Sequence, residues 1–90
     1  MIYDDASYIL GSKLSKKILE CLNSSKEPLA PLQISKLTGI ARSNISTKLG
    51  QLNKRNLVKC INPKARKWRF YTITSKGKEV LKKIDAMNKS

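Results

Sequence analysis

Apolar residues recur at regular intervals in the first quarter of the chain. Leu10, Leu14, Ile18 and Leu22 are spaced by four positions, and Leu19 widens the stripe into the neighbouring row. This period predicts an amphipathic helix over residues 9–23. The turn-forming residues 23–28 close it, and residues 1–8 precede it as an N-terminal extension.

A second, shorter helix is predicted over residues 31–38. Pro31 suits the first turn of a helix, because the proline nitrogen has no hydrogen to donate there. Gly39 suits the position after the last turn, where the backbone often takes a left-handed conformation.

The next apolar period lies only a few residues further on. Ile45, Leu49 and Leu52 occupy positions i, i+4 and i+7 of a helix predicted over residues 42–55. Asn56 can adopt the left-handed conformation that ends it. Two helices joined by a short turn that contains glycine are typical of a helix-turn-helix.

The period changes to that of strands in the last third of the chain. Residues 57–62 and 68–73 are rich in β-forming side chains and predict a hairpin over residues 57–73. Thr74 or Ser75 can cap a final helix over residues 75–88. Its apolar side is formed by Val80, Leu81, Ile84 and Met87. The expected fold is α+β and mostly helical, with three helices, a two-stranded hairpin and a C-terminal helix in one domain over residues 1–90.

The distribution of charge indicates the class of partner. The 90 residues carry 19 lysines and arginines, six acids and a formal net charge of +13. Between Pro28 and Lys78 there are twelve of these cations and no acid. A surface needed only for solubility mixes both signs, because charges of one sign repel each other. An acid-free stretch therefore favours a polyanionic partner, and we expect nucleic acid.

The reactive residues exclude several other classes. The chain has no histidine, and Cys21 and Cys60 are too far apart for a zinc or redox motif, so we expect free thiols, no metal and no cofactor. Without a central carboxylate pair or a glycine-rich phosphate loop, an enzyme is not expected, and nothing marks a small-molecule pocket. No apolar run approaches the roughly 18 residues of a membrane span. The acidic N-terminus is unlike a signal peptide, so we expect a cytoplasmic, nucleoid-associated protein with no membrane contact.

Residues 40–58 resemble the recognition helix of winged helix-turn-helix regulators of the arsenic-resistance and multiple-antibiotic-resistance repressor type. The matching apolar and serine positions are Ile45, Ser46, Leu49, Leu52, Leu57 and Val58. Residues 71–77 are similar to the segment where the family's wing, its β-hairpin, meets the closing helix. Ala41 stands where the family favours a serine cap, and Asn56 replaces its usual glycine. The metal-sensing cysteine motif of the arsenic type is missing.

The resemblance implies a winged-helix fold, double-stranded DNA as partner, and a homodimer built by the first and last helices. It also implies a prokaryotic source, for which we expect an archaeon.

Candidate DNA contacts follow from the helix geometry. With its apolar residues toward the core, a step of about 100° per residue turns the polar ones of 42–55 outward. Asparagine and glutamine can read adenine, serine and threonine can pair with several base edges, and cations bind phosphates. The expected contacts of this helix are Arg42, Ser43, Asn44, Ser46, Thr47, Lys48, Gln51, Lys54 and Arg55. Lys36, on the preceding helix, is a further phosphate candidate.

The expected tip of the wing carries Lys64, Arg66, Lys67 and Arg69. These cations can lie along the phosphate backbone or enter a narrow minor groove. If Tyr71 and Ile73 face the core, strand alternation places Phe70 and Trp68 on the other side, with Ile61 beside them. This apolar patch can pack across the strands, be covered by a terminal segment or second subunit, or stack on bases.

The sequence therefore predicts a sequence-selective, DNA-binding regulator of transcription. A winged-helix module that docks on another protein, and a non-specific architectural protein of chromatin, are the alternatives. RNA binding is less favoured, because the paired aromatic residues of RNA-recognition sheets are not evident.

Overall fold

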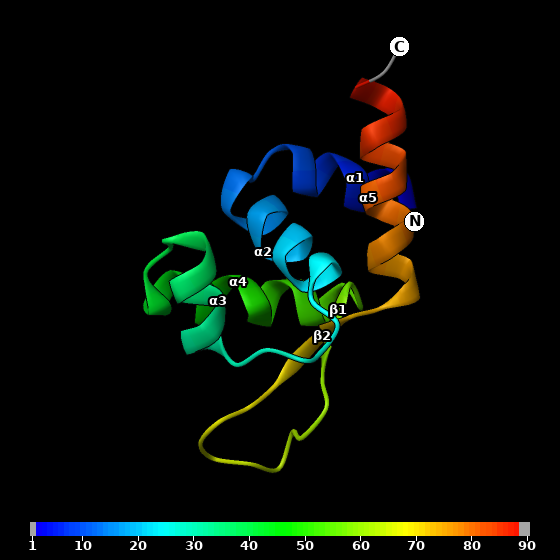
Figure 1. Ribbon diagram of the computed structural model, residues 1–90. Helices are drawn as coiled ribbons and strands as arrows, with labels where there is room; N and C mark the ends of the chain where they lie inside the picture. The colour runs from blue at the N-terminus through cyan, green and yellow to red at the C-terminus, as the bar shows by residue number, and fades with distance from the viewer. Residues whose placement is uncertain (1, 89–90) are drawn as a thin grey trace.

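A computed structural model describes residues 2–88 of the chain. Within this part the fold is mostly helical, with one two-stranded antiparallel sheet (Figure 1). The elements in chain order are α1 (Ile2–Leu10), α2 (Lys13–Ser24), α3 (Pro31–Thr38), α4 (Arg42–Lys54), β1 (Val58–Cys60), β2 (Tyr71–Ile73) and α5 (Ser75–Asn88). Helices α3 and α4 form the predicted helix-turn-helix, and β1 and β2 form the wing.

The N-terminal quarter differs from the prediction of one helix over residues 9–23. The helix is interrupted between α1 and α2. Ser12 caps the start of α2, because its side chain accepts a 3.3 Å hydrogen bond from the Ser15 amide. Residues 2–8, predicted as an extension, belong to α1. Glycine is a poor helix former, so Gly11 and the Ser12 cap favour a helix end here more than the apolar period favours its continuation. Leu10 was predicted as the first residue of the apolar stripe, but it is consequently 46% exposed and lies outside the core.

The helix-turn-helix has the predicted ends, except that α4 ends at Lys54, one residue before the predicted Arg55. Pro31 opens α3, and Gly39 closes it with a left-handed φ of 76°. Helix α4 begins at Arg42, and its N-cap residue, Ala41, makes no side-chain cap hydrogen bond. Asn56 has a φ of 63° directly after the α4 cap, as its residue type predicts. Thr74, rather than Ser75, caps α5, because its Oγ1 accepts a 3.0 Å hydrogen bond from the Gly77 amide.

The strands are shorter than the two predicted β-rich runs. Val58 pairs with Ile73, Lys59 with Thr72, and Cys60 with Tyr71. A third segment that pairs with the hairpin was not predicted. Leu29, before α3, forms an isolated bridge with Tyr71 through backbone hydrogen bonds of 2.9 and 2.8 Å. This bridge ties the start of the helix-turn-helix to the base of the wing.

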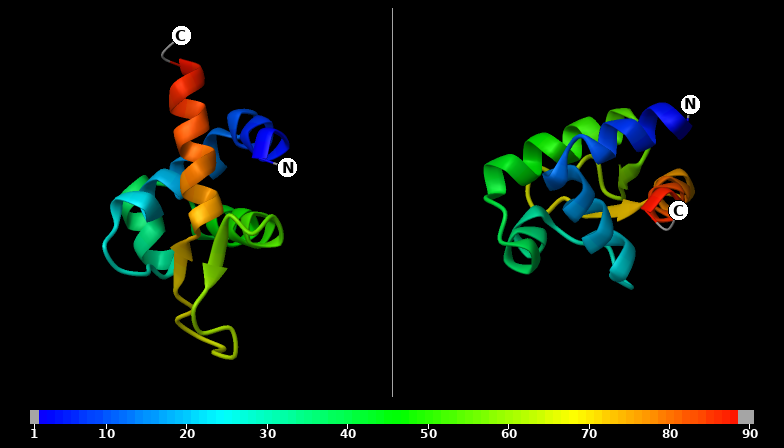
Figure 2. Two further views of the ribbon diagram at one scale, coloured as in Figure 1. Left: turned by 90° about the vertical axis from the view of Figure 1, so that its right-hand side faces the viewer. Right: turned by 90° about the horizontal axis from the view of Figure 1, so that it is seen from above.

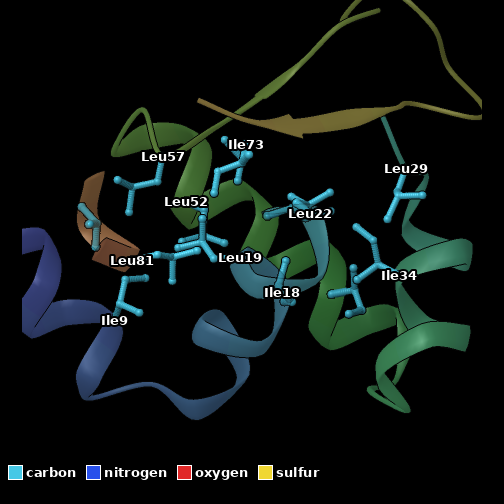
Figure 3. Packing of buried hydrophobic residues seen from close by; sticks show 14 of the residues in the cluster. Ile9, Ile18, Leu19, Leu22, Leu29, Ile34, Leu52, Leu57, Ile73 and Leu81 are labelled. Carbon is cyan, nitrogen blue, oxygen red and sulfur yellow. The ribbon is translucent and has the colours of Figure 1, made fainter. Parts of the chain in front are cut away.

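One apolar cluster joins the helices and the hairpin. Figure 3 shows Ile9 of α1, Ile18 and Leu19 of α2, Ile34 of α3 and Leu52 of α4 meeting within it. In α5, Val80, Leu81 and Ile84 are buried as predicted, whereas Met87 is 42% exposed. The last turn of α5 therefore extends beyond the core.

The loop of the wing and the C-terminal end of α5 lie at opposite ends of the molecule (Figures 1 and 2). Helix α1 packs mainly against α5, away from the wing loop. None of the helices in residues 2–88 is long and apolar enough to cross a membrane.

Candidate nucleic-acid interface

Burial of three side chains sets the rotation of α4 about its axis. Ile45, Leu49 and Leu52 have at most 1% of their surface exposed, as the apolar period predicts. The opposite face is open to solvent, apart from the half-buried Lys48. The exposed residues of α4 are Arg42, Ser43, Asn44, Ser46, Thr47, Gly50, Gln51, Asn53 and Lys54. This face is almost entirely polar and carries no acid.

The wing loop has a defined internal structure. Asn62 donates from Nδ2 to the Trp68 carbonyl at 3.0 Å, and its Oδ1 accepts from the Phe70 amide at 2.8 Å. Arg69 Nε donates to the Ala65 carbonyl at 2.7 Å. One asparagine thus holds both sides of the loop beyond the end of the strands. The four predicted wing cations, Lys64, Arg66, Lys67 and Arg69, are all exposed.

A groove of about 730 Å³ separates the wing from α4. Its walls come from three places: the start of α3, one edge of α4 and the wing loop. The lining residues are Ala30, Pro31, Leu32, Arg42, Ser46, Gly50, Arg66, Lys67, Trp68, Arg69 and Tyr71. Four of these are cations and none is an acid, so the groove favours an anion.

The structure thus brings Arg42 and Ser46 of α4 together with three wing cations around one groove. The other predicted contacts do not line it. Ser43, Asn44, Thr47, Lys48, Gln51 and Lys54 lie elsewhere on α4, Lys64 is elsewhere on the wing loop, and Lys36 is exposed in the last turn of α3. Thr47 Oγ1 donates to the Ser43 carbonyl at 3.1 Å, which leaves its lone pairs for a further donor.

Arg55 has partners within the chain. Its Nη1 donates to Oδ1 of Asp5 at 3.1 Å. Lys76 Nζ lies 3.0 Å from the other Asp5 oxygen and donates to the Arg55 carbonyl at 2.9 Å. Burial alone would raise the pKa of the Asp5 carboxyl, but the contacts with Lys76 and Arg55 outweigh it and hold that pKa below its ordinary value.

Tyr8 adds a second link between α1 and α4. Its hydroxyl donates a 2.6 Å hydrogen bond to Oε1 of Gln51, and the Arg55 guanidinium lies 3.9 Å from the centre of its ring. Gln51 and Arg55 were predicted as DNA contacts, and the sequence reasoning missed these partners within the chain. Asp5 and Tyr8 are three residues apart, so they share one face once residues 2–10 are helical. Treating this segment as an extension hid that signal.

Both cysteines, Cys21 and Cys60, are free and half-buried, and burial raises the pKa of the Cys21 thiol. Among residues 2–88 there is no group of three or more cysteine, aspartate, glutamate or histidine side chains that could hold a metal ion.

The fold is similar to that of several solved transcription regulators. The regulator Tm0710 of Thermotoga maritima is 24% identical, with a TM-score of 0.72 over 96% of this chain and 63% of its own. MarR of E. coli in its apo form is 14% identical, with a TM-score of 0.73 over 96% of this chain and 70% of its own. This chain has the winged helix-turn-helix fold of MarR-family regulators.

A third structure with the MarR fold is the transcriptional regulator PcaV from Streptomyces coelicolor, solved with its natural ligand. It is 18% identical, with a TM-score of 0.73 over 83% of this chain and 53% of its own. The chain spans about half the length of the first structures it matches. No protein-family model and no curated protein matches the sequence. With identities this low, the likeness establishes the fold.

Proposed function

We propose that this protein is a sequence-selective, double-stranded DNA-binding regulator of transcription. The observation that carries the proposal is the acid-free groove between α4 and the wing, with four cations around it. In this proposal α4 enters the major groove, and the wing lies along the adjacent backbone or in the minor groove. The fold, shared with MarR-family transcription regulators, supports it.

The residues divide into two roles. Asn44, Ser46, Thr47 and Gln51 carry the hydroxyl and amide groups that read base edges in a major groove. Arg42, Lys36, Lys48, Lys54 and the wing cations bind phosphates and set the register of the protein on the duplex. Arg55 is not part of the proposed interface, because its guanidinium already donates to Asp5 and lies over the Tyr8 ring. Gln51 keeps its two amide hydrogens for a base, since Tyr8 uses only its oxygen.

The proposal includes a two-fold dimer. Leu10 of α1 and Met87 of α5 are 46% and 42% exposed, on the two helices that pack against each other away from the wing. A 90-residue domain has a small core and gains buried apolar area by pairing. Sedimentation at neutral pH checks this: a species of twice 10.1 kDa supports the dimer, and a species of only 10.1 kDa contradicts it.

Direct titration tests the proposed partner. Labelled duplexes, with single-stranded RNA as the competitor class, are titrated with the protein while fluorescence anisotropy is recorded at several salt concentrations. Non-specific DNA binding alone has a Kd on the order of 10⁻⁴–10⁻⁶ M at physiological salt, and a specific site binds more tightly. Tighter, salt-dependent binding to one duplex sequence supports the proposal. Absence of duplex binding, or preference for the RNA, contradicts it.

A further inference from the structure

Gly50 has no explanation within the fold. It lies in the middle of α4, where glycine is less favourable than alanine, and it is exposed. Its φ is not in the left-handed range, so the backbone does not require glycine. Apart from its two chain neighbours and the nearby backbone of α4 itself, a Cβ at this position would have no described atom within 4 Å. Neither conformation nor packing within the chain therefore excludes a larger side chain. Gly50 does line the groove beside the wing.

Trp68 lines the same groove from the wing side. Its φ of 56° is left-handed, which is strained for a bulky residue, and its side chain is 60% exposed. Asn62 holds this backbone in place by hydrogen bonding to the Trp68 carbonyl and the Phe70 amide. No described residue accepts a hydrogen bond from the indole. The loop thus presents a large apolar ring to solvent at the cost of local strain.

The two residues are accompanied by charge. Arg42 and Ser46 stand on the α4 edge of the groove with Gly50, at intervals of four residues, and the wing adds Arg66, Lys67 and Arg69. The groove therefore has one helix position without a side chain, an apolar ring and several cations. A sugar–phosphate strand alternates anionic phosphates with apolar sugar faces and matches all three.

We propose that this groove seats one sugar–phosphate strand of a DNA duplex. Gly50 lets that strand approach the α4 backbone, Trp68 packs against its deoxyribose, and Arg42 and Arg69 bind its phosphates. This assignment, called the strand seat below, rests on the proposed function and deepens it. With α4 in the major groove and the wing at the adjacent minor groove, the DNA strand that separates the two grooves must pass between α4 and the wing.

Substitution of Gly50 by alanine tests whether the DNA strand approaches the α4 backbone at this position. Gly50→Ala should raise the melting temperature, because alanine is the better helix former and the space is open. The same variant should bind a labelled duplex of mixed sequence about tenfold more weakly. A purely structural role moves affinity and stability in the same direction. Gly11→Ala is the matched control: Gly11 is also exposed and lies away from the groove, and its affinity should equal that of the wild type.

Trp68 provides the second readout, because it is the only tryptophan in the chain. Saturation with unlabelled duplex should quench or shift its emission, and Trp68→Phe should retain more affinity than Trp68→Ala. Wild-type affinity in Gly50→Ala, or an unchanged Trp68 spectrum at saturation, overturns the strand seat and leaves the proposed function standing. Failure of the wild type to bind any duplex overturns both.

Discussion

The Asp5 carboxylate and the Arg55 guanidinium form a 3.1 Å ion pair between α1 and the end of α4. The two residues are 50 positions apart, and Lys76 at the start of α5 contacts the same carboxylate. The Asp5 side chain is only 5% exposed, whereas those of Arg55 and Lys76 are more than one-third exposed. One buried acid therefore fixes the position of α4 relative to the two terminal helices.

Replacing Asp5 by asparagine should destabilise the fold. The change keeps the shape but removes the charge that faces two cations, which can then be only partly rehydrated. We expect a loss of about 1–2 kcal/mol, between that of a surface pair and that of a broken buried pair. For a domain of this size that lowers Tm by about 4–8 °C per kcal/mol. Asp4→Asn, at an exposed neighbouring acid, is the control and should leave Tm nearly unchanged. Equal Tm values for the two variants would rule out the role of Asp5.

The same carboxyl gives the stability a defined pH dependence. The pKa of Asp5 is lower in the fold than its ordinary value of 3.8, so the unfolded chain binds the proton more readily. Its contribution is complete above pH 3.8 and is lost as the pH falls through the folded pKa. Urea titrations at a series of pH values should therefore give a constant difference between the wild type and Asp5→Asn near neutrality. The difference should shrink below pH 3.8, and one that grows in acid would reverse the assignment.

Gly77 should not tolerate a side chain. A Cβ there would collide with the Leu57 carbonyl oxygen and lie 2.7 Å from Cγ1 of Ile73, where the first turn of α5 meets the base of the hairpin. Gly77→Ala should therefore cost about 1–3 kcal/mol by overpacking, although alanine is the better helix former. Chemical denaturation checks this, with Gly50→Ala as the opposite case because its site is open. Stabilisation by both changes would mean that α5 packs differently.

Variants of the wing and variants of α4 should lose DNA binding in different ways. Replacing Arg66 and Lys67 by alanine should weaken binding to all duplexes and flatten the dependence of log K on log salt by about 0.9 per lost phosphate contact. Thr47→Ala should leave that slope nearly intact, cost about 1–3 kcal/mol at the preferred site and relax the base preference there. Affinity titrations on preferred and scrambled duplexes separate the two. Equal losses on both duplexes from both variants would remove the base-reading role of α4.

Local signals were enough to predict the helix-turn-helix and the wing. The four-residue spacing of Ile45 and Leu49, together with Gly39 and Asn56 after the helices, specifies α4 and its exposed face. The break before α2 was missed because the apolar spacing runs across it, whereas Gly11 and the Ser12 cap decide the local backbone.

The partners of Arg55 and Gln51 depend on contacts across some 50 and 43 positions of sequence. Charge and polarity predict that both residues face outward. Only the packing of α1 against α4 shows that both already form hydrogen bonds within the chain. The groove beside Gly50 is of the same kind, because three separate segments meet there.

Selection of bound sequences from a random pool of DNA duplexes tests the central claim most directly. If α4 reads base edges and the protein acts as a two-fold dimer, the bound fraction should become enriched in one palindromic sequence. Its half-sites should be separated by about one helical turn, or a multiple of it. Retention of duplexes without enrichment of any sequence would contradict selective reading and describe a basic protein that recognises the DNA backbone alone.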